Sequence, residues 1–185
     1  MELEQGEVTL ESPAPEITEA AGEALGRALG PGALVALVGE LGSGKTTLVR
    51  GLARGLGIEG PVTSPSFALM QEYAGRVPLY HFDAWMRGRE AALLAEGAAE
   101  YLDGPGVAVV EWADRVTELL PAPRLEIRLF HLAEERRGLV VRVVPGPDNR
   151  ASREQGQALE TARKALLATP GLISRDGKGG NADGR

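Results

Sequence analysis

The chain has 185 residues, of which 43% are hydrophobic and 25% charged, and its formal net charge is −6. This balance argues against disorder over most of the length, and the absence of cysteine excludes disulfides, thiolate metal sites and cysteine nucleophiles. The negative charge, with acidic and basic residues interspersed, argues against tight direct binding of nucleic acid. No apolar run approaches the roughly 20 residues of a membrane span, and Met1–Glu7 lacks the pattern of a signal peptide, so we expect a cytoplasmic protein without a membrane partner.

Hydrophobic spacing predicts alternating strands and helices. Residues 33–38 and 107–110 are apolar on both faces, as in buried parallel strands, whereas 125–132 and 139–144 alternate in polarity around a charged turn, as in an antiparallel hairpin. The expected elements, in chain order, are a strand at 8–10, a helix at 16–29, a strand at 33–38, a helix at 46–56, a loop at 61–67, strands at 69–73 and 78–82, a helix at 89–102, a strand at 107–110, the hairpin at 125–132 and 139–144, and a polar helix at 150–168.

Residues 39–46, Gly-Glu-Leu-Gly-Ser-Gly-Lys-Thr, match the phosphate-binding pattern G-x-x-x-x-G-K-[ST] between a predicted strand and a predicted helix. Glycines let backbone N–H groups turn toward phosphates, and the following helix points its positive end at the same charge. Lys45, the only lysine before Lys164, can reach the β- and γ-phosphates, and the Thr46 hydroxyl can take a magnesium position. The sequence therefore predicts ATP and Mg²⁺ as cofactors on an α/β P-loop NTPase fold, with a mixed, mostly parallel sheet flanked by helices and an antiparallel C-terminal hairpin.

Two carboxylates end predicted strands and are candidates for the metal side of the site. Glu111 follows the strand at 107–110, and Asp83 follows the strand at 78–82. Because parallel strands end at the same edge of a sheet as the P-loop, both could face the phosphates. We predict that Glu111 binds the metal directly and that Asp83 binds a metal water or orients the attacking water. A surface carboxylate or a helix cap is the alternative for either residue.

Other residues near these strand ends leave alternatives open. His81 is better explained by packing or a structural hydrogen bond than by a role as a base. Trp85 is expected in the core, whereas Trp112 could pack there or shelter the nucleotide. Residues 63–67 occupy the place where other P-loop proteins keep a switch that senses the γ-phosphate, and an ordinary polar turn is the alternative.

Three later motifs carry a family resemblance. They are Val62-Thr63-Ser64-Pro65-Ser66-Phe67, His81-Phe82-Asp83 and Val110-Glu111-Trp112-Ala113-Asp114-Arg115. In this order behind the P-loop, and over roughly residues 8–144, the chain resembles the bacterial TsaE (YjeE) family. That family is the ATPase component of the machinery that makes threonylcarbamoyladenosine beside the anticodon of tRNA. Ser66, Ala113 and Ala84-Trp85 depart from the family's usual Thr, Pro and Leu-Tyr, and none of these changes removes a phosphate or metal ligand.

The resemblance implies a Mg²⁺-dependent ATPase that is weak alone and acts with a TsaB–TsaD complex, through which it reaches tRNA indirectly. Lys45, Asp83 and Glu111 would be catalytic, and Thr46 and Glu111 would bind the metal. The residues implied in nucleotide binding are Thr18, Leu41, Gly42, Ser43, Gly44, Lys45, Thr46, Thr47, Thr63, Ser66, Trp112 and Arg136.

Two other functions stay open. A small-molecule P-loop kinase fits the size and the P-loop, with Arg136–Arg137 imitating lid arginines, although no separate acceptor-binding segment is evident. A nucleotide-dependent scaffold without significant turnover would use ATP only to order the loop at 63–67.

The chain is expected to divide into three parts. These are an ATPase domain at 1–145, a C-terminal helical extension at 146–168 and a disordered, Gly-rich tail at 169–185. The free protein is expected to be a monomer, with an oligomer of unknown size as the alternative.

Overall fold

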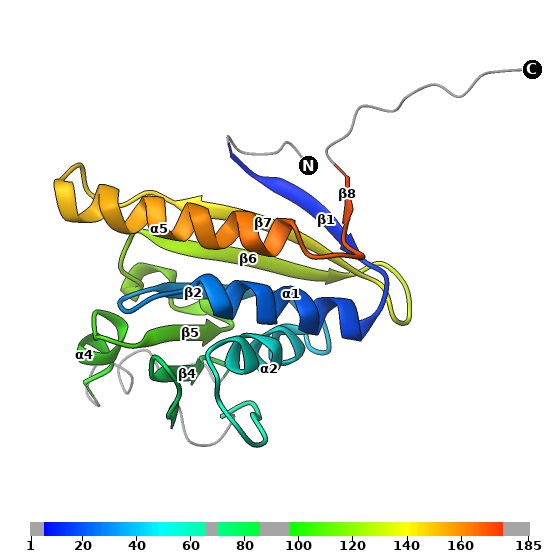
Figure 1. Cartoon of the computed structure of the whole chain (residues 1–185), viewed down its shortest axis with the longest axis horizontal. Coiled ribbons are helices and arrows are strands. Elements are labelled where there is room, and N and C mark those ends of the chain that lie inside the picture. Colours follow the sequence, from blue (N-terminus) through cyan, green and yellow to red (C-terminus); the bar gives the residue numbers. More distant parts are fainter. Residues whose placement is uncertain (1–5, 66–69, 86–96, 176–185) are drawn as a thin grey trace, which may run out of the picture.

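The computed structural model describes residues 6–65, 70–85 and 97–175, which form a mixed sheet with helices on both faces (Figure 1). The elements, in chain order, are β1 (Val8–Ser12), α1 (Pro15–Ala28), β2 (Leu34–Val38), α2 (Lys45–Gly55), β3 (Met70–Tyr73), β4 (Leu79–Asp83), α4 (Ala98–Leu102), β5 (Val107–Glu111), the 3₁₀ turns η1 (Ala113–Arg115) and η2 (Thr117–Leu119), β6 (Arg124–His131), β7 (Arg137–Val144), α5 (Arg150–Leu167) and β8 (Ile173–Ser174).

The sheet has the strand order β3-β4-β5-β2-β6-β7-β1-β8. Its centre is parallel, since β2 pairs in parallel with β5 and β6, and β4 pairs in parallel with β5. The outer strands are antiparallel, including the β6–β7 hairpin. The predicted fold class, a mostly parallel sheet with an antiparallel C-terminal hairpin, is confirmed. This order places the carboxyl ends of β4, β5, β2 and β6 along one edge, where the P-loop leaves β2.

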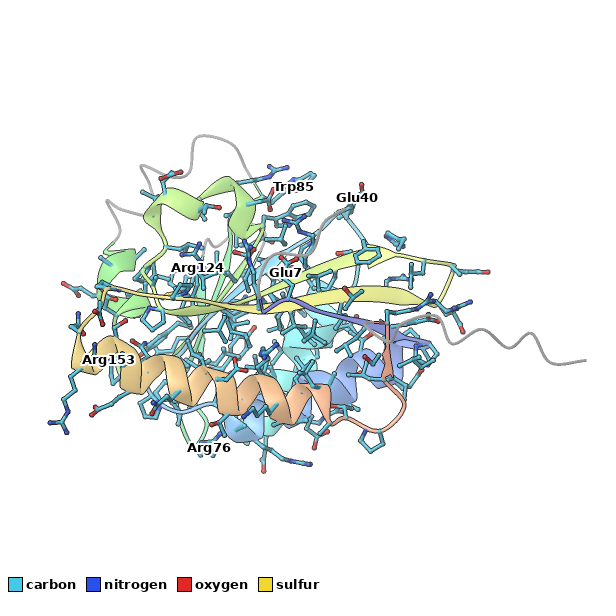
Figure 2. All side chains as sticks on the ribbon, turned by 90° about the horizontal axis from the view of Figure 1, so that it is seen from above. Glu7, Glu40, Arg76, Trp85, Arg124 and Arg153 are labelled. Atoms are coloured by element: carbon cyan, nitrogen blue, oxygen red, sulfur yellow. The ribbon has the colours of Figure 1, made fainter. Side chains whose placement is uncertain are left out.

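Two hydrophobic clusters lie on the two faces of the sheet. The larger cluster joins the sheet to α1, α2 and α5, through residues such as Leu25, Leu52 and Leu159. The smaller one joins the other face to α4 and η1, through residues such as Phe82 and Ala98. Figure 2 looks along the sheet and shows α1 and α5 on one side and the segments around α4 on the other. The central strands are buried on both sides, which explains why their sequences are apolar throughout.

The helices α1 and α2 cross with their backbones in contact. The crossing is made by two glycines on each helix, Gly22 and Gly26 on α1 and Gly51 and Gly55 on α2. A Cβ atom at Gly51 would lie 1.8 Å from the Glu19 carbonyl oxygen of α1, so only glycine fits there. This contact fixes α2, whose first turn carries the end of the P-loop, against the rest of the domain.

The C-terminal segment differs from the three-part division expected above. Leu159 and Leu166 of α5 are buried in the same core as α1, so α5 belongs to the domain. The expected tail begins with described structure, because β8 pairs with β1 and the Arg175 N–H donates to Thr9 O at 2.8 Å. The edge of β1 that is not paired with β7 supplies the backbone partners of β8. The polar sequence of the segment does not predict this pairing, because the pairing uses backbone groups at a strand edge. Residues 176–185 lie outside the described part of the chain.

Two further expectations are tested only in part. The helix predicted at 89–102 is seen at its end as α4, and residues 86–96 lie outside the described ranges. Within the described ranges, no helix combines the length and apolar character required to cross a membrane.

Candidate nucleotide-binding site

The P-loop connects β2 to α2 and takes its shape from glycine. Gly44 has φ +102° and directly precedes α2, so the chain enters the helix from a left-handed conformation. Gly39 packs against the hairpin, where a Cβ would lie 2.2 Å from Leu129 O. The loop thereby holds the first N–H groups of α2 toward a cleft, the usual arrangement for binding an anion.

This cleft has a volume of about 560 Å³ and lies along the edge formed by the carboxyl ends of the parallel strands. Its wall is formed by Leu41, Gly42, Ser43, Gly44, Lys45, Thr46, Thr47, Arg50, Ser64, Asp83, Trp85, Glu111 and Trp112. The structure therefore brings the predicted P-loop residues, both predicted carboxylates and Trp112 to one cleft.

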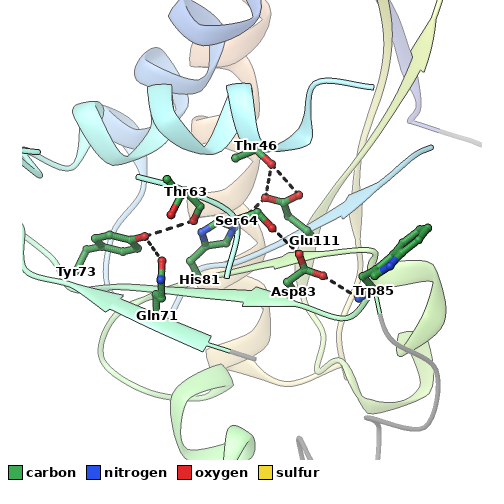
Figure 3. A network of polar contacts seen from close by, with 9 residues as sticks. All are labelled: Thr46, Thr63, Ser64, Gln71, Tyr73, His81, Asp83, Trp85 and Glu111. Carbon is green, nitrogen blue, oxygen red and sulfur yellow. Dashed lines mark hydrogen bonds and ion pairs between the residues drawn. The ribbon is translucent and has the colours of Figure 1, made fainter. Parts of the chain in front are cut away.

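Thr46 and Glu111, which both line the cleft, contact each other (Figure 3). The Thr46 hydroxyl lies 2.9 Å from Oε1 and 3.1 Å from Oε2 of the Glu111 carboxylate. A hydroxyl and a carboxylate oxygen are the hard ligands that Mg²⁺ prefers, and P-loop sites complete the shell with phosphate and water oxygens. The pair fits the expected metal position.

Asp83 lies beside Glu111, because β4 and β5 pair in parallel with these two residues opposite each other. Its Oδ2 accepts a hydrogen bond from the Ser64 hydroxyl at 2.5 Å, and its Oδ1 accepts one from the Trp85 N–H at 2.8 Å. Two donors hold this carboxylate in one orientation at the cleft wall. They also connect the loop at 63–65 to the end of β4 (Figure 3).

Lys45 is buried, and its ammonium group contacts the protein itself. The Nζ atom donates to Gly39 O at 2.8 Å and Glu40 O at 2.9 Å, and it lies 3.7 Å from the centroid of the Trp112 ring. Burial lowers the pKa of Lys45 below its ordinary value, and the nearby Glu111, Asp114 and Asp83 carboxylates oppose that shift. Phosphate oxygens would stabilise the charged form that burial disfavours.

The two tryptophans pack against each other at the cleft wall. Their ring centroids are 4.4 Å apart with planes tilted by 54°, and the Arg115 guanidinium lies 4.5 Å from Trp85 and 5.0 Å from Trp112. The expectation that Trp85 packs in the core is wrong: it is 41% exposed, because the chain leaves the sheet directly after β4. Trp112 is buried in the smaller cluster and also lines the cleft.

His81 is fully buried, and its Nε2 atom lies 2.9 Å from Glu111 Oε1. The expected structural hydrogen bond is confirmed, and its partner is the candidate metal ligand.

Some expected nucleotide contacts are not among the cleft residues. Thr18 is buried beside Gly44 of the P-loop, and its hydroxyl donates to Ser12 Oγ at 2.8 Å. Thr63 is exposed and does not line the cleft, whereas its neighbour Ser64 does. Ser66 lies outside the described residues.

The structure also separates the two neighbouring arginines. Arg136 donates to Glu11 at 2.6 Å, away from the cleft, whereas Arg137 reaches back to Gly42 O at 3.3 Å. Arg137 is the first residue of β7 and Arg136 belongs to the preceding turn, so the end of the hairpin brings Arg137 to the P-loop and Arg136 to β1.

His131 was not predicted, and its Nε2 atom lies 3.3 Å from Leu41 O. The signal that could have found it is its place at the carboxyl end of β6, the other parallel neighbour of β2.

The family model described as "Threonylcarbamoyl adenosine biosynthesis protein TsaE" matches residues 12–139. The chain belongs to the TsaE family. It is 42% identical over 120 residues to the TsaE of Treponema pallidum, covering 65% of this chain and 89% of that protein. It is 40% identical over 131 residues to the TsaE of Bacillus subtilis, covering 70% of this chain and 82% of that protein.

The fold is also similar to a solved structure. The crystal structure of YdiB from Bacillus subtilis superposes with a TM-score of 0.67 at 32% identity, covering 83% of this chain and 94% of the other. The resemblance to TsaE proteins inferred from the three motifs is thus confirmed by sequence and by fold.

Proposed function

We propose that this TsaE-family chain binds and hydrolyses Mg²⁺–ATP and acts in the formation of threonylcarbamoyladenosine in tRNA. The observation that carries the proposal is the contact between Thr46 and Glu111 beside Lys45, at the N-terminus of α2. A hydroxyl, a carboxylate and an ammonium group that meet at one cleft support the proposal, because a P-loop ATPase needs such groups as metal and phosphate ligands. The family membership supplies the pathway.

The roles of the individual residues follow from their positions. Thr46 and Glu111 would hold Mg²⁺, which neutralises charge on the β- and γ-phosphates. Lys45 would exchange its two carbonyl partners for phosphate oxygens. Asp83, held by Ser64 and the Trp85 N–H, is oriented to accept a proton or a hydrogen bond from water at the cleft wall.

The contact between Ser64 and Asp83 supports a switch role for the loop at 63–65. A ligand that changes the orientation of the Asp83 carboxylate also changes the hydrogen bond that holds this loop. The loop would thereby report the state of the nucleotide to a partner. From the family we propose that the partner is a TsaB–TsaD complex, that tRNA is reached through it, and that turnover is weak without it.

The test is ATP consumption by the full chain alone and then with TsaB–TsaD and tRNA. We expect slow turnover alone and a strong increase with the partners. Glu111→Gln should abolish the Mg²⁺-dependent activity, while Glu118→Gln, an exposed carboxylate seven residues away, should leave it unchanged. Fast partner-free turnover with a small acceptor would instead identify a kinase, and unchanged hydrolysis by Glu111→Gln would refute the metal assignment.

A further inference from the structure

We propose that His81 is a positioning residue for the metal site: its Nε2–H holds the Glu111 carboxylate in the orientation that receives Mg²⁺ together with Thr46. The inference rests on the proposed function, because it requires the ion at Thr46 and Glu111. It adds a residue from a second strand to the site.

The first step is the geometry of the pair. The Nε2 and Oε1 atoms are 2.9 Å apart, and the side chains are 0% and 3% exposed, so water does not compete for this contact. Metal binding requires the ionised form of Glu111, and an ionised carboxylate only accepts hydrogen bonds, so in that form Nε2 carries the proton. The other ring nitrogen, Nδ1, is buried and has no hydrogen-bond partner within the described ranges. The one polar contact recorded for the buried ring is thus with Glu111.

The second step is the need of Glu111 for a restraint. A glutamate has three side-chain torsions, and a carboxylate that can rotate presents its oxygens to a metal in many orientations. Thr46 offers a single hydroxyl hydrogen, and its Oγ1 atom lies 2.9 and 3.1 Å from the two carboxylate oxygens, so this contact alone does not favour one of them. A donor on a different element, His81 of β4, contacts Oε1 alone (Figure 3). With both contacts, the orientation of the group is determined before the ion arrives.

The third step is the comparison with simple packing. A buried histidine with a single polar contact loses hydration that an apolar ring of similar size would not lose. His81 lies on the same face of β4 as Asp83, since side chains two residues apart on a strand share a face. Its neighbour Phe82 points to the opposite face and packs in the smaller apolar cluster. The polar ring thus stands on the face that carries the site.

The experiment measures Mg²⁺ dependence of ADP binding by the full-length protein, not turnover. The two tryptophans of the chain both line the cleft, so their fluorescence reports ADP binding. ADP affinity is measured in EDTA and across a Mg²⁺ titration for wild type, His81→Gln, His81→Asn and His81→Phe. Glutamine can place an N–H donor near the position of Nε2, whereas asparagine reaches only that of Nδ1, and phenylalanine keeps the ring without a donor.

We expect His81→Asn and His81→Phe to raise the Mg²⁺ concentration at half effect by roughly 10- to 100-fold, the usual cost of losing a group that orients a metal ligand. His81→Gln should stay within about threefold of wild type, and ADP affinity in EDTA should be the same for all four proteins. On a Glu111→Gln background, His81→Phe should cause no additional shift. If His81→Phe does not fold by circular dichroism, the comparison of His81→Gln with His81→Asn decides.

Two results would overturn the inference. One is a Mg²⁺ dependence in His81→Asn and His81→Phe equal to that of wild type. The other is a loss of ADP affinity of the same size in EDTA and in Mg²⁺, which indicates packing alone. A wild-type protein that shows no effect of Mg²⁺ would refute the proposed metal site itself, so the two failures are distinguishable.

Discussion

Gly51→Ala tests the contact between α1 and α2 that holds the P-loop helix in place. A methyl group at this position would lie 1.8 Å from Glu19 O, 2.8 Å from Glu19 C and 2.9 Å from Glu23 N. All three atoms belong to the backbone of α1, so no side-chain rotation can relieve the contact. Ordinary contact begins at 3.4 Å, so the helices must separate locally or deform.

The cost follows from two opposing effects. Overpacking of this kind costs about 1–3 kcal/mol, and a backbone neighbour puts Gly51→Ala near the upper end. Alanine is the better helix former by about 1 kcal/mol, which offsets part of the cost. We expect a net loss of about 2 kcal/mol in the free energy of unfolding and, for a domain of this size, a Tm lower by about 4–8 °C.

The matched control is Gly156→Ala in α5, where a Cβ would meet nothing within 4 Å. The same substitution should there raise stability by about 0.5–1 kcal/mol, because only the helix-propensity effect remains. Urea unfolding followed by circular dichroism measures both variants. A Gly51→Ala protein as stable as Gly156→Ala would show that the two helices are not in backbone contact.

Three further predictions concern binding, pH and the C-terminal helix. Arg137→Ala should weaken ATP binding about tenfold, because it removes the charged donor that contacts Gly42 O of the P-loop, whereas Arg136→Ala, which removes a contact with Glu11, should change ATP binding by less than about threefold; equal effects in a binding titration would show that the contact with Gly42 does not support the P-loop. Burial lowers the pKa of Lys45 in the free protein, whereas bound phosphate favours its charged form, so ATP binding takes up a proton at pH values between the lowered pKa and 10.5. ATP affinity should therefore fall as the pH rises through this range. Calorimetry in two buffers that shows no proton uptake in this range would refute the prediction. Leu166→Ala in α5 should lower the free energy of unfolding by about 2–5 kcal/mol, with a single unfolding transition, because Leu166 is fully buried. A loss under about 1 kcal/mol, or a separate transition for α5, would mean that α5 is an independent extension.

The sequence alone predicted those parts of the site that depend on local chemistry and on one topological rule. The P-loop is a contiguous motif, and its glycines, Lys45 and Thr46 follow from the residue types that phosphate binding requires. Glu111 and Asp83 could be paired across 28 residues because parallel strands end at the same edge of a sheet. The partner of His81 could not be read in this way, since it depends on the register between β4 and β5.

Tertiary structure decided the features that depend on where a strand begins or ends, on the open edge of the sheet and on the contact between two helices. Arg137 donates to Gly42 O of the P-loop whereas Arg136 donates to Glu11, and two neighbouring arginines in a sequence give no sign of which one does so. Trp85 is exposed because β4 ends two residues earlier, and the start of the expected tail is ordered because β1 has an open edge. The glycines of α1 and α2 acquire their role only where the two helices cross. A sequence pattern records which residue types a local structure needs, whereas these features arise from distances between segments far apart in the chain.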